Sequence, residues 1–172
     1  DMSRKFFLCS RAQHVEIGGM PIIIGERINP TGKKKLSADI KDRKYELVRQ
    51  TAVDQERSGA HCLDINVGVP NVDEKVLLPE AVAIVQGAVS VPVVLDSSYP
   101  EAIEEALRIC DGRVLINSVN GKEKSLHSIL PLAKRFGAMV IALLIDEEGI
   151  PATLEKRMAI AEKIVKTARQ YG

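Results

Sequence analysis

The sequence predicts an α/β protein that is built from five consecutive βα units. Short apolar runs rich in β-branched residues recur along the chain, and they are continuous rather than alternating, which is typical of parallel strands buried on both faces. Segments with helical periodicity separate these runs, as crossovers between parallel strands require. The chain has 172 residues, of which 45% are hydrophobic, and this is enough for one packed core.

The predicted strands are the apolar runs at residues 22–24, 62–67, 93–95, 114–116 and 139–144. A short hairpin is predicted before them, with strands around residues 7–9 and 15–17, because Gly18 and Gly19 break the chain directly after it. Five right-handed βα units form either an open doubly wound sheet or part of a (β/α)8 barrel.

The first two predicted helices follow the first and second strands. Leu47, Val48, Ala52 and Gln55 have helical spacing and predict a helix that ends near Gly59. Residues 73–90 are also predicted to be helical. A kink or restart is expected there at residue 79, because proline has no amide proton to donate.

The last three predicted helices have both an apolar face and an end signal. Pro100 suits the first turn of the third helix, and its predicted apolar face is Ile103, Ala106, Leu107 and Cys110. The fourth has the face Leu126, Ile129, Leu130 and Ala133, with Gly137 where a closing glycine belongs. The fifth has the face Leu154, Met158, Ala161, Val165 and Ala168, with Thr153 as its N-cap.

Composition excludes several classes of function. The 24 basic and 23 acidic residues nearly cancel and aromatic residues make up only 3%, which is unlike a nucleic-acid-binding protein. The longest apolar run, residues 138–145, is far shorter than the roughly 20 residues of a membrane span. Cys9, Cys62 and Cys110 show no CxxC spacing, so we expect packing roles in a reducing cytoplasm. The three histidines have no metal-ligand spacing, and no metal is expected.

Polar residues gather where the predicted strands end, and this is where α/β proteins build ligand sites. These candidate site residues are Glu26, Arg27, Asn29, Asp64, Asn66, Asp96 and Asn117. No GxGxxG or P-loop motif follows any strand, so a dinucleotide or a phosphate loop is not indicated. Carboxylates and amides together match a planar heterocycle with donors and acceptors along one edge, such as a pterin or a purine.

Two of these features also have a simpler interpretation. Asp64 and Asp96 could cap the helices that follow their strands. The run of lysines at residues 33–35 could be a solvated loop, or it could attract the anionic tail of a ligand.

Five motifs in order resemble the pterin-binding domain of cobalamin-dependent methionine synthase, in the dihydropteroate synthase-like superfamily. They are IGERINPTG at residues 24–32, LDINVG at 63–68, LDSS at 95–98, INSVNG at 116–121 and DEEGIP at 146–151. The resemblance implies a (β/α)8 TIM barrel. The chain would then hold its five N-terminal βα units at residues 20–172, after a leading hairpin segment at residues 1–19.

The resemblance also implies an activity and roles for the candidate residues. In that family the domain binds methyltetrahydrofolate and presents its N5-methyl group to the cob(I)alamin of a separate cobalamin module or corrinoid protein, with homocysteine as the eventual acceptor. Asp96 and Asn117 would hydrogen-bond the pterin ring, and Asp64 and Asn66 would lie nearby. Glu26, Arg27 and Asn29 would shape the floor and wall of the cavity.

The catalytic contact to N5 is expected outside these five units. In relatives it comes from an Asn after the seventh strand, and a further pterin-binding Asp follows the sixth, so no residue here is assigned to catalysis. Five units do not close a barrel, and three explanations stand: a fragment of a longer protein, two copies that complement each other, or a natural half-barrel. We expect an oligomer through the open edges, with dihydropteroate synthase or a non-catalytic pterin-binding assembly half-domain as alternative functions.

Overall fold

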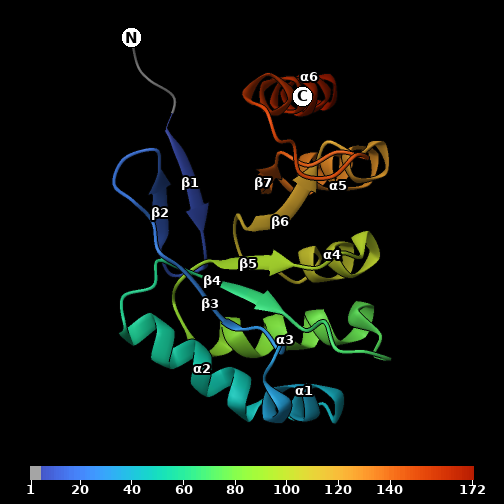
Figure 1. The fold of residues 1–172 in the computed structure, drawn as a ribbon. Helices are drawn as coiled ribbons and strands as arrows, with labels where there is room; N and C mark the ends of the chain where they lie inside the picture. The colour runs from blue at the N-terminus through green and yellow to red at the C-terminus, as the bar shows by residue number, and fades with distance from the viewer. Residues whose placement is uncertain (1–4) are drawn as a thin grey trace. The chain divides into compact units, whose positions relative to one another are not determined.

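The computed structural model describes residues 5–172, and residues 1–4 of the predicted leading segment lie outside the described part. Two compact units make up the chain, Asp1–Leu115 and Ile116–Gly172, and each is described by itself (Figure 1). The predicted division after residue 19 stays a prediction. Five strands, each followed by at least one helix, run in chain order after an initial hairpin, so the five βα units are confirmed.

The hairpin consists of β1 (Phe6–Cys9) and β2 (His14–Ile17), which pair antiparallel with Phe6 opposite Ile17. Leu8 is its buried residue. The backbone N–H of Cys9 donates to the carbonyl oxygen of Arg113 at 2.8 Å, and this bond ties the hairpin to the rest of the first unit.

The first unit contains three parallel strands, β3 (Ile24–Ile28), β4 (Cys62–Asn66) and β5 (Val93–Asp96). Strands β4 and β5 are buried almost throughout, as their continuous apolar sequences predict. Strand β3 lies further along the chain than the predicted residues 22–24. The strand begins at Ile24 and continues to Ile28, so Glu26 and Arg27 lie within it rather than after it.

Four helices belong to the first unit: α1 (Lys34–Lys41), α2 (Glu46–Arg57), α3 (Glu74–Ala88) and α4 (Pro100–Leu107). Helix α1 was not predicted, and the solvated-loop interpretation of the lysine run is wrong for Lys34 and Lys35, which begin this helix. It forms because Leu36 and Ile40, four residues apart, are both buried on one face.

The course of α3 and the end of α4 also differ from prediction. Helix α3 runs through Pro79 without a restart, because five apolar side chains bury one side of it and this packing outweighs one missing hydrogen bond. Helix α4 ends at Leu107, so Cys110 lies beyond it and not on its apolar face.

The second unit contains β6 (Leu115–Asn120), α5 (Glu123–Phe136), β7 (Met139–Leu143) and α6 (Leu154–Tyr171), with β6 and β7 as neighbours in the sheet. Strand β6 is longer than predicted and includes Asn117. Two end signals are confirmed. Gly137 ends α5 with a φ of 67°, and the hydroxyl of Thr153 accepts a hydrogen bond from the backbone N–H of Lys156 at 3.3 Å.

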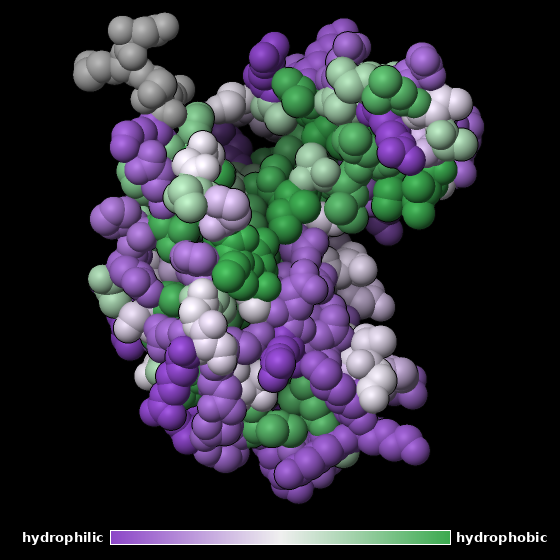
Figure 2. Space-filling model, turned by 60° about the vertical axis from the view of Figure 1, so that its left-hand side comes forward, coloured by the Kyte–Doolittle hydropathy of each residue, from purple (hydrophilic) through white to green (hydrophobic). Residues whose placement is uncertain are grey.

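The predicted apolar face of α6 is wrong. Leu154, Met158 and Val165 are 69%, 52% and 49% exposed, and the buried residues are Ile160 and Ile164. The helix has two apolar stripes, and the packing of this unit buries the isoleucine stripe. Strand β7 is not buried on both faces either, since Leu143 is 39% exposed. Figure 2 shows such apolar side chains, in green, at the surface.

Two glycines provide a matched test of packing. A Cβ at Gly25 would lie 2.6 Å from Gln55 Oε1 and 2.9 Å from Leu63 Cδ2, whereas a Cβ at Gly87 in α3 would meet nothing within 4 Å. We expect Gly25→Ala to lower the free energy of unfolding by about 1–3 kcal/mol through overpacking. Gly87→Ala should raise it by about 0.5–1 kcal/mol, because alanine favours the helix. Urea denaturation measures both, and a neutral Gly25→Ala would contradict the close contact with Gln55.

Candidate functional site

The carboxyl ends of β4 and β5 bring Asn66 and Asp96 together. The two residues are direct partners in the parallel register. The Asn66 Nδ2 donates to Asp96 Oδ2 at 2.9 Å, and Asn66 Oδ1 accepts from the backbone N–H of Gly68 at 2.8 Å. These two bonds fix the direction of the amide. The second carboxylate oxygen of Asp96 makes no hydrogen bond to any residue within 5–172, and the side chain is only half-buried.

Asp64 lies on the same face of β4 as Asn66, because residues two apart on a strand point the same way. It is 3% exposed, and its side chain has an interaction of its own. The helix-capping interpretation is wrong for both aspartates. Asp73 caps α3 and Tyr99 is the N-cap residue of α4.

Glu74 and Ser97 join this cluster, although the sequence did not identify Glu74 as a site residue. The Ser97 hydroxyl donates to Glu74 Oε2 at 2.6 Å and accepts from the backbone N–H of Tyr99 at 3.1 Å. A Cβ built on Gly68 would lie 3.3 Å from Glu74 Oε1 and 3.1 Å from Asn66 Oδ1. The first turn of α3 therefore places a second carboxylate beside the strand ends.

Strand β3 has an irregular register between Gly25 and Ile28, which is a bulge of the kind found near functional sites. The backbone N–H of Arg27 there donates to Gln55 Oε1 at 2.8 Å. Gln55 comes from α2 and is 5% exposed, and its Nε2 has no hydrogen-bond partner among the described residues. The sequence placed Gln55 on an apolar face without a role. In the structure it holds the bulge.

Of the other two residues predicted here, Glu26 lies in the middle of β3 and Asn29 directly follows the strand. Glu26 is exposed on the strand. Asn29 Oδ1 accepts from the backbone N–H of Thr31 at 2.9 Å, so the Asn29 side chain holds the turn that follows the strand. Ile28 pairs with Ile65, which places Asn29 beside the end of β4.

Asn117 lies in β6 of the second unit, where it is half-buried and has an interaction of its own. Its contact with a pterin ring remains a prediction, as do the ligand contacts of the other six candidate residues.

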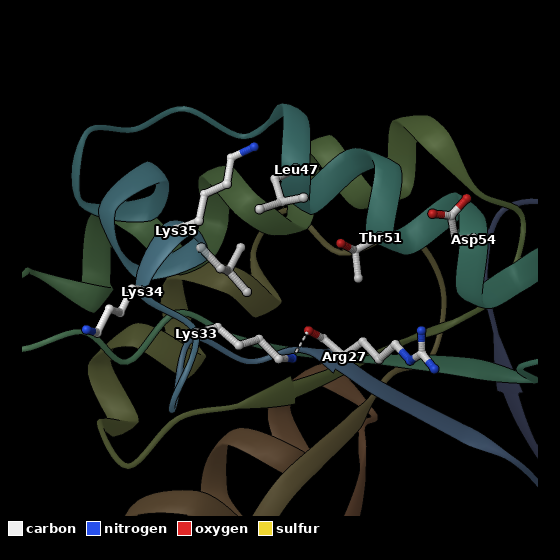
Figure 3. Close-up of a pocket in the computed structure, with 8 residues that line it drawn as sticks. Arg27, Lys33, Lys34, Lys35, Leu47, Thr51 and Asp54 are labelled. Carbon is white, nitrogen blue, oxygen red and sulfur yellow. Dashed lines mark hydrogen bonds between the residues drawn. The ribbon is translucent and has the colours of Figure 1, made fainter.

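Arg27 also lines a cavity of about 430 Å³ between β3, α1 and α2 (Figure 3). The three lysines of the run at residues 33–35 line it as well, together with one carboxylate, that of Asp54. The cavity is therefore strongly basic.

Cys62 and Cys110 offer no reactive thiolate. Burial raises the pKa of Cys62 to about 11, and burial likewise raises the pKa of Cys110 to about 12. Both of these thiols are protonated near neutral pH, so neither is indicated as a nucleophile.

Curated proteins with similar sequences are methyltransferases. The chain is 33% identical over 149 residues to a methionine synthase of Mycobacterium tuberculosis and 34% identical over 152 residues to that of Mycobacterium leprae, and each match covers 84% of this chain and 12% of the relative. It is 31% identical over 156 residues to a methylcorrinoid:tetrahydrofolate methyltransferase of Eubacterium limosum, covering 88% of this chain and 56% of the relative. The chain thus spans about one eighth of the methionine synthases it matches.

The fold also matches a solved structure, the homocysteine methyltransferase of Escherichia coli in its apo form. The TM-score is 0.55 at 17% identity, and the match covers 87% of this chain and 70% of the other. That protein is a TIM barrel, so the match confirms the predicted fold class of barrel βα units. The family model described as pterin binding enzyme matches residues 25–172, and the chain belongs to this family.

Proposed function

We propose that this chain binds methyltetrahydrofolate and takes part in the transfer of its N5-methyl group to a corrinoid. Support comes from its relatives, two of which are methionine synthases and one of which is a methylcorrinoid:tetrahydrofolate methyltransferase. The observation that carries the proposal is the Asp96 carboxylate, which Asn66 holds at 2.9 Å with one oxygen left for a ligand.

This geometry suits one edge of a pterin ring. The ring presents a guanidine-like pair of N–H donors, and a carboxylate accepts from such a pair in a charge-assisted arrangement. Because the amide of Asn66 is itself fixed by Gly68, the carboxylate is oriented before the ligand arrives. In this proposal Asp64 and Asn66 complete the polar lining, and Glu26 and Asn29 form part of its wall. The role proposed for Asn117 is a hydrogen bond to the pterin ring.

The chemistry sets a further requirement. The N5–methyl bond would break with its electron pair left on N5, and the reduced corrinoid, as the nucleophile, would supply the electron pair of the new bond to the methyl group. Without help, N5 would have to depart as a nitrogen anion, which is a poor leaving group. A proton or a strong hydrogen bond at N5 in the transition state lets it depart as a neutral amine. We assign the described residues to binding and orientation of the pterin, and we leave the group that acts at N5 unassigned.

Titration with 5-methyltetrahydrofolate followed by addition of cob(I)alamin tests this function. Saturable heat of binding together with loss of the cob(I)alamin absorbance supports methyl transfer. Binding without transfer supports the pterin-binding half-domain instead. Condensation of a pterin pyrophosphate with p-aminobenzoate would indicate a dihydropteroate synthase, and no binding of any folate would overturn the proposal.

We propose that the corrinoid is carried by a separate domain or partner protein and that the chain acts in the cytoplasm. Methionine synthases and a methylcorrinoid enzyme among the relatives support the first point. No helix within residues 5–172 has both the length and the apolarity needed to cross a bilayer.

We also propose that copies of this chain associate through apolar surface. Leu154, Met158 and Val165 form an exposed apolar face on α6, and burial of such surface is worth about 25 cal/mol per Å². We expect light scattering at micromolar concentration to show an oligomer, and Met158→Lys should shift it toward the monomer. Met20→Lys, at a position that is 84% exposed, is the matched control and should leave the mass unchanged. A monomeric parent chain would contradict this proposal.

A further inference from the structure

The cavity between β3, α1 and α2 concentrates positive charge that the protein does not neutralise. Four cationic residues, Arg27, Lys33, Lys34 and Lys35, line it, and Asp54 is the one acidic residue of the lining. The whole chain has a net charge of only +1, so this excess is local. None of these four cations forms an ion pair with a carboxylate within residues 5–172. Unpaired like charges around a concave surface attract an anionic ligand.

The positions of the charged groups are set by the backbone around them. Lys33 Nζ donates to the carbonyl oxygen of Arg27 at 2.7 Å, which keeps its ammonium group at the end of β3 (Figure 3). Arg27 belongs to the bulge that Gln55 holds. Lys35 extends toward Leu47, whereas the side chain of Lys34 points away from Arg27.

The lining between these charges is partly apolar. Leu36 and Leu47 contribute hydrocarbon surface, and Thr51 contributes a hydroxyl. Asp54 accepts from Gln50 Nε2 at 2.9 Å, so its carboxylate has a protein partner outside the four cations. Charged groups around hydrocarbon surface suit a ligand whose carboxylates are separated by methylene groups.

The cavity begins close to the proposed pterin site. Asp96 lies on β5, two strands from β3, and neighbouring strands are about 4.8 Å apart, so the separation across the sheet is about 10 Å. The turn at residues 29–33 runs from the end of β3 to the first lysine of the cavity. An elongated ligand held at Asp96 by one end would have to span this separation between β5 and β3 to place its other end in the cavity.

We propose that this cavity binds the γ-glutamyl tail of the folate substrate, an inference that rests on the proposed function. Folate carries its glutamate at the opposite end from the pterin, beyond a p-aminobenzoyl spacer. Each added γ-linked glutamate contributes one further carboxylate and two methylene groups. The tail thus has the alternation of anionic and apolar groups that the cavity lining matches.

Calorimetry with 5-methyltetrahydrofolate carrying one or three glutamates tests the proposal. We expect the triglutamate to bind about tenfold more tightly at low salt. Its two additional carboxylates can each pair with a cation of the cavity, and ion pairs at a partly exposed site each contribute modestly to affinity. The advantage should shrink as salt rises through about 0.15 M, where the Debye length is about 8 Å. The double variant Lys33→Gln/Lys35→Gln should abolish the advantage. Lys41→Gln, in the last turn of α1 and outside the cavity lining, should retain it.

The outcomes separate this inference from the proposed function. Equal affinities for the two folates, with both binding, would overturn the tail site and leave the pterin site standing. The same loss in Lys41→Gln as in the double variant would also overturn it, because the effect would then be one of net charge. Free tri-γ-glutamate is the probe that contains no pterin. If it binds in a lysine-dependent way while no folate binds, the cavity is a glutamyl site and the proposed function fails. If neither binds, both fail.

Discussion

Replacing Asp96 with alanine is expected to weaken the binding of 5-methyltetrahydrofolate by about 10- to 150-fold. This corresponds to about 1.5–3 kcal/mol, the range for loss of a hydrogen bond to a charged group. One carboxylate oxygen accepts from the Asn66 amide and the other makes no hydrogen bond to a described residue, so this is the group best placed to bind a pterin edge. Calorimetric titration of the variant and the parent chain measures the difference directly.

Two further variants define what the Asp96 result means. Asp96→Asn keeps the size of the side chain and removes its charge. A comparable loss of affinity in this variant would show that the ligand is bound through the negative charge. Asp42→Ala removes an exposed carboxylate that pairs with Lys44 and should leave affinity unchanged. Parent-like affinity in Asp96→Ala would instead assign this residue to the support of the strand end.

Asn66→Asp is expected to produce a large, pH-dependent loss of stability. The variant replaces a donor that lies 2.9 Å from a carboxylate oxygen with a second carboxylate. Like charges at this distance disfavour ionisation, so the pKa of the new carboxyl at position 66 should be raised in the folded state. A pKa raised above its unfolded value costs stability as pH rises, because the unfolded chain releases the proton first. We expect about 2–3 kcal/mol to be lost at pH 8 and most of it to return near pH 4.

Denaturant unfolding at several pH values measures this effect, with Asn71→Asp as the control. Asn71 is exposed in the loop before α3 and has a φ of 62°, a conformation that aspartate tolerates. The same chemical change there should alter stability little at any pH. Parallel pH profiles for the two variants would show that Asn66 and Asp96 are not paired in solution.

The sequence predicted the parts of the fold that local signals determine. Pro100, Gly137 and Thr153 identify helix ends through backbone chemistry that acts within a few residues, and all three occur where expected. The choice between two apolar stripes on α6 depends on which side meets the rest of the unit, and periodicity alone contains no such information. Helix α1 was not predicted because its buried apolar face consists of only two residues, Leu36 and Ile40.

In the candidate site, too, the residues set by local sequence were predicted and those set by packing were not. Asp64, Asn66 and Asp96 were found because strand ends are recognisable in the sequence and parallel strands align them. Glu74 and Gln55 were missed as site residues because they reach the strands from helices. Their direction depends on how α3 and α2 are rotated about their axes, and this is decided only when the chain packs.

Gln55 imposes a constraint on which sequences can encode this strand. Gln55 Oε1 accepts the hydrogen bond from the backbone N–H of Arg27, while Gln55 Nε2 has no partner among the described residues. The structure therefore requires one acceptor atom at this distance from α2. Glutamine is a neutral side chain of that length that provides such an acceptor, and its amide nitrogen comes with it. Lineages that lose the bulge in β3 would be released from this constraint, and an apolar residue would then be favoured at position 55.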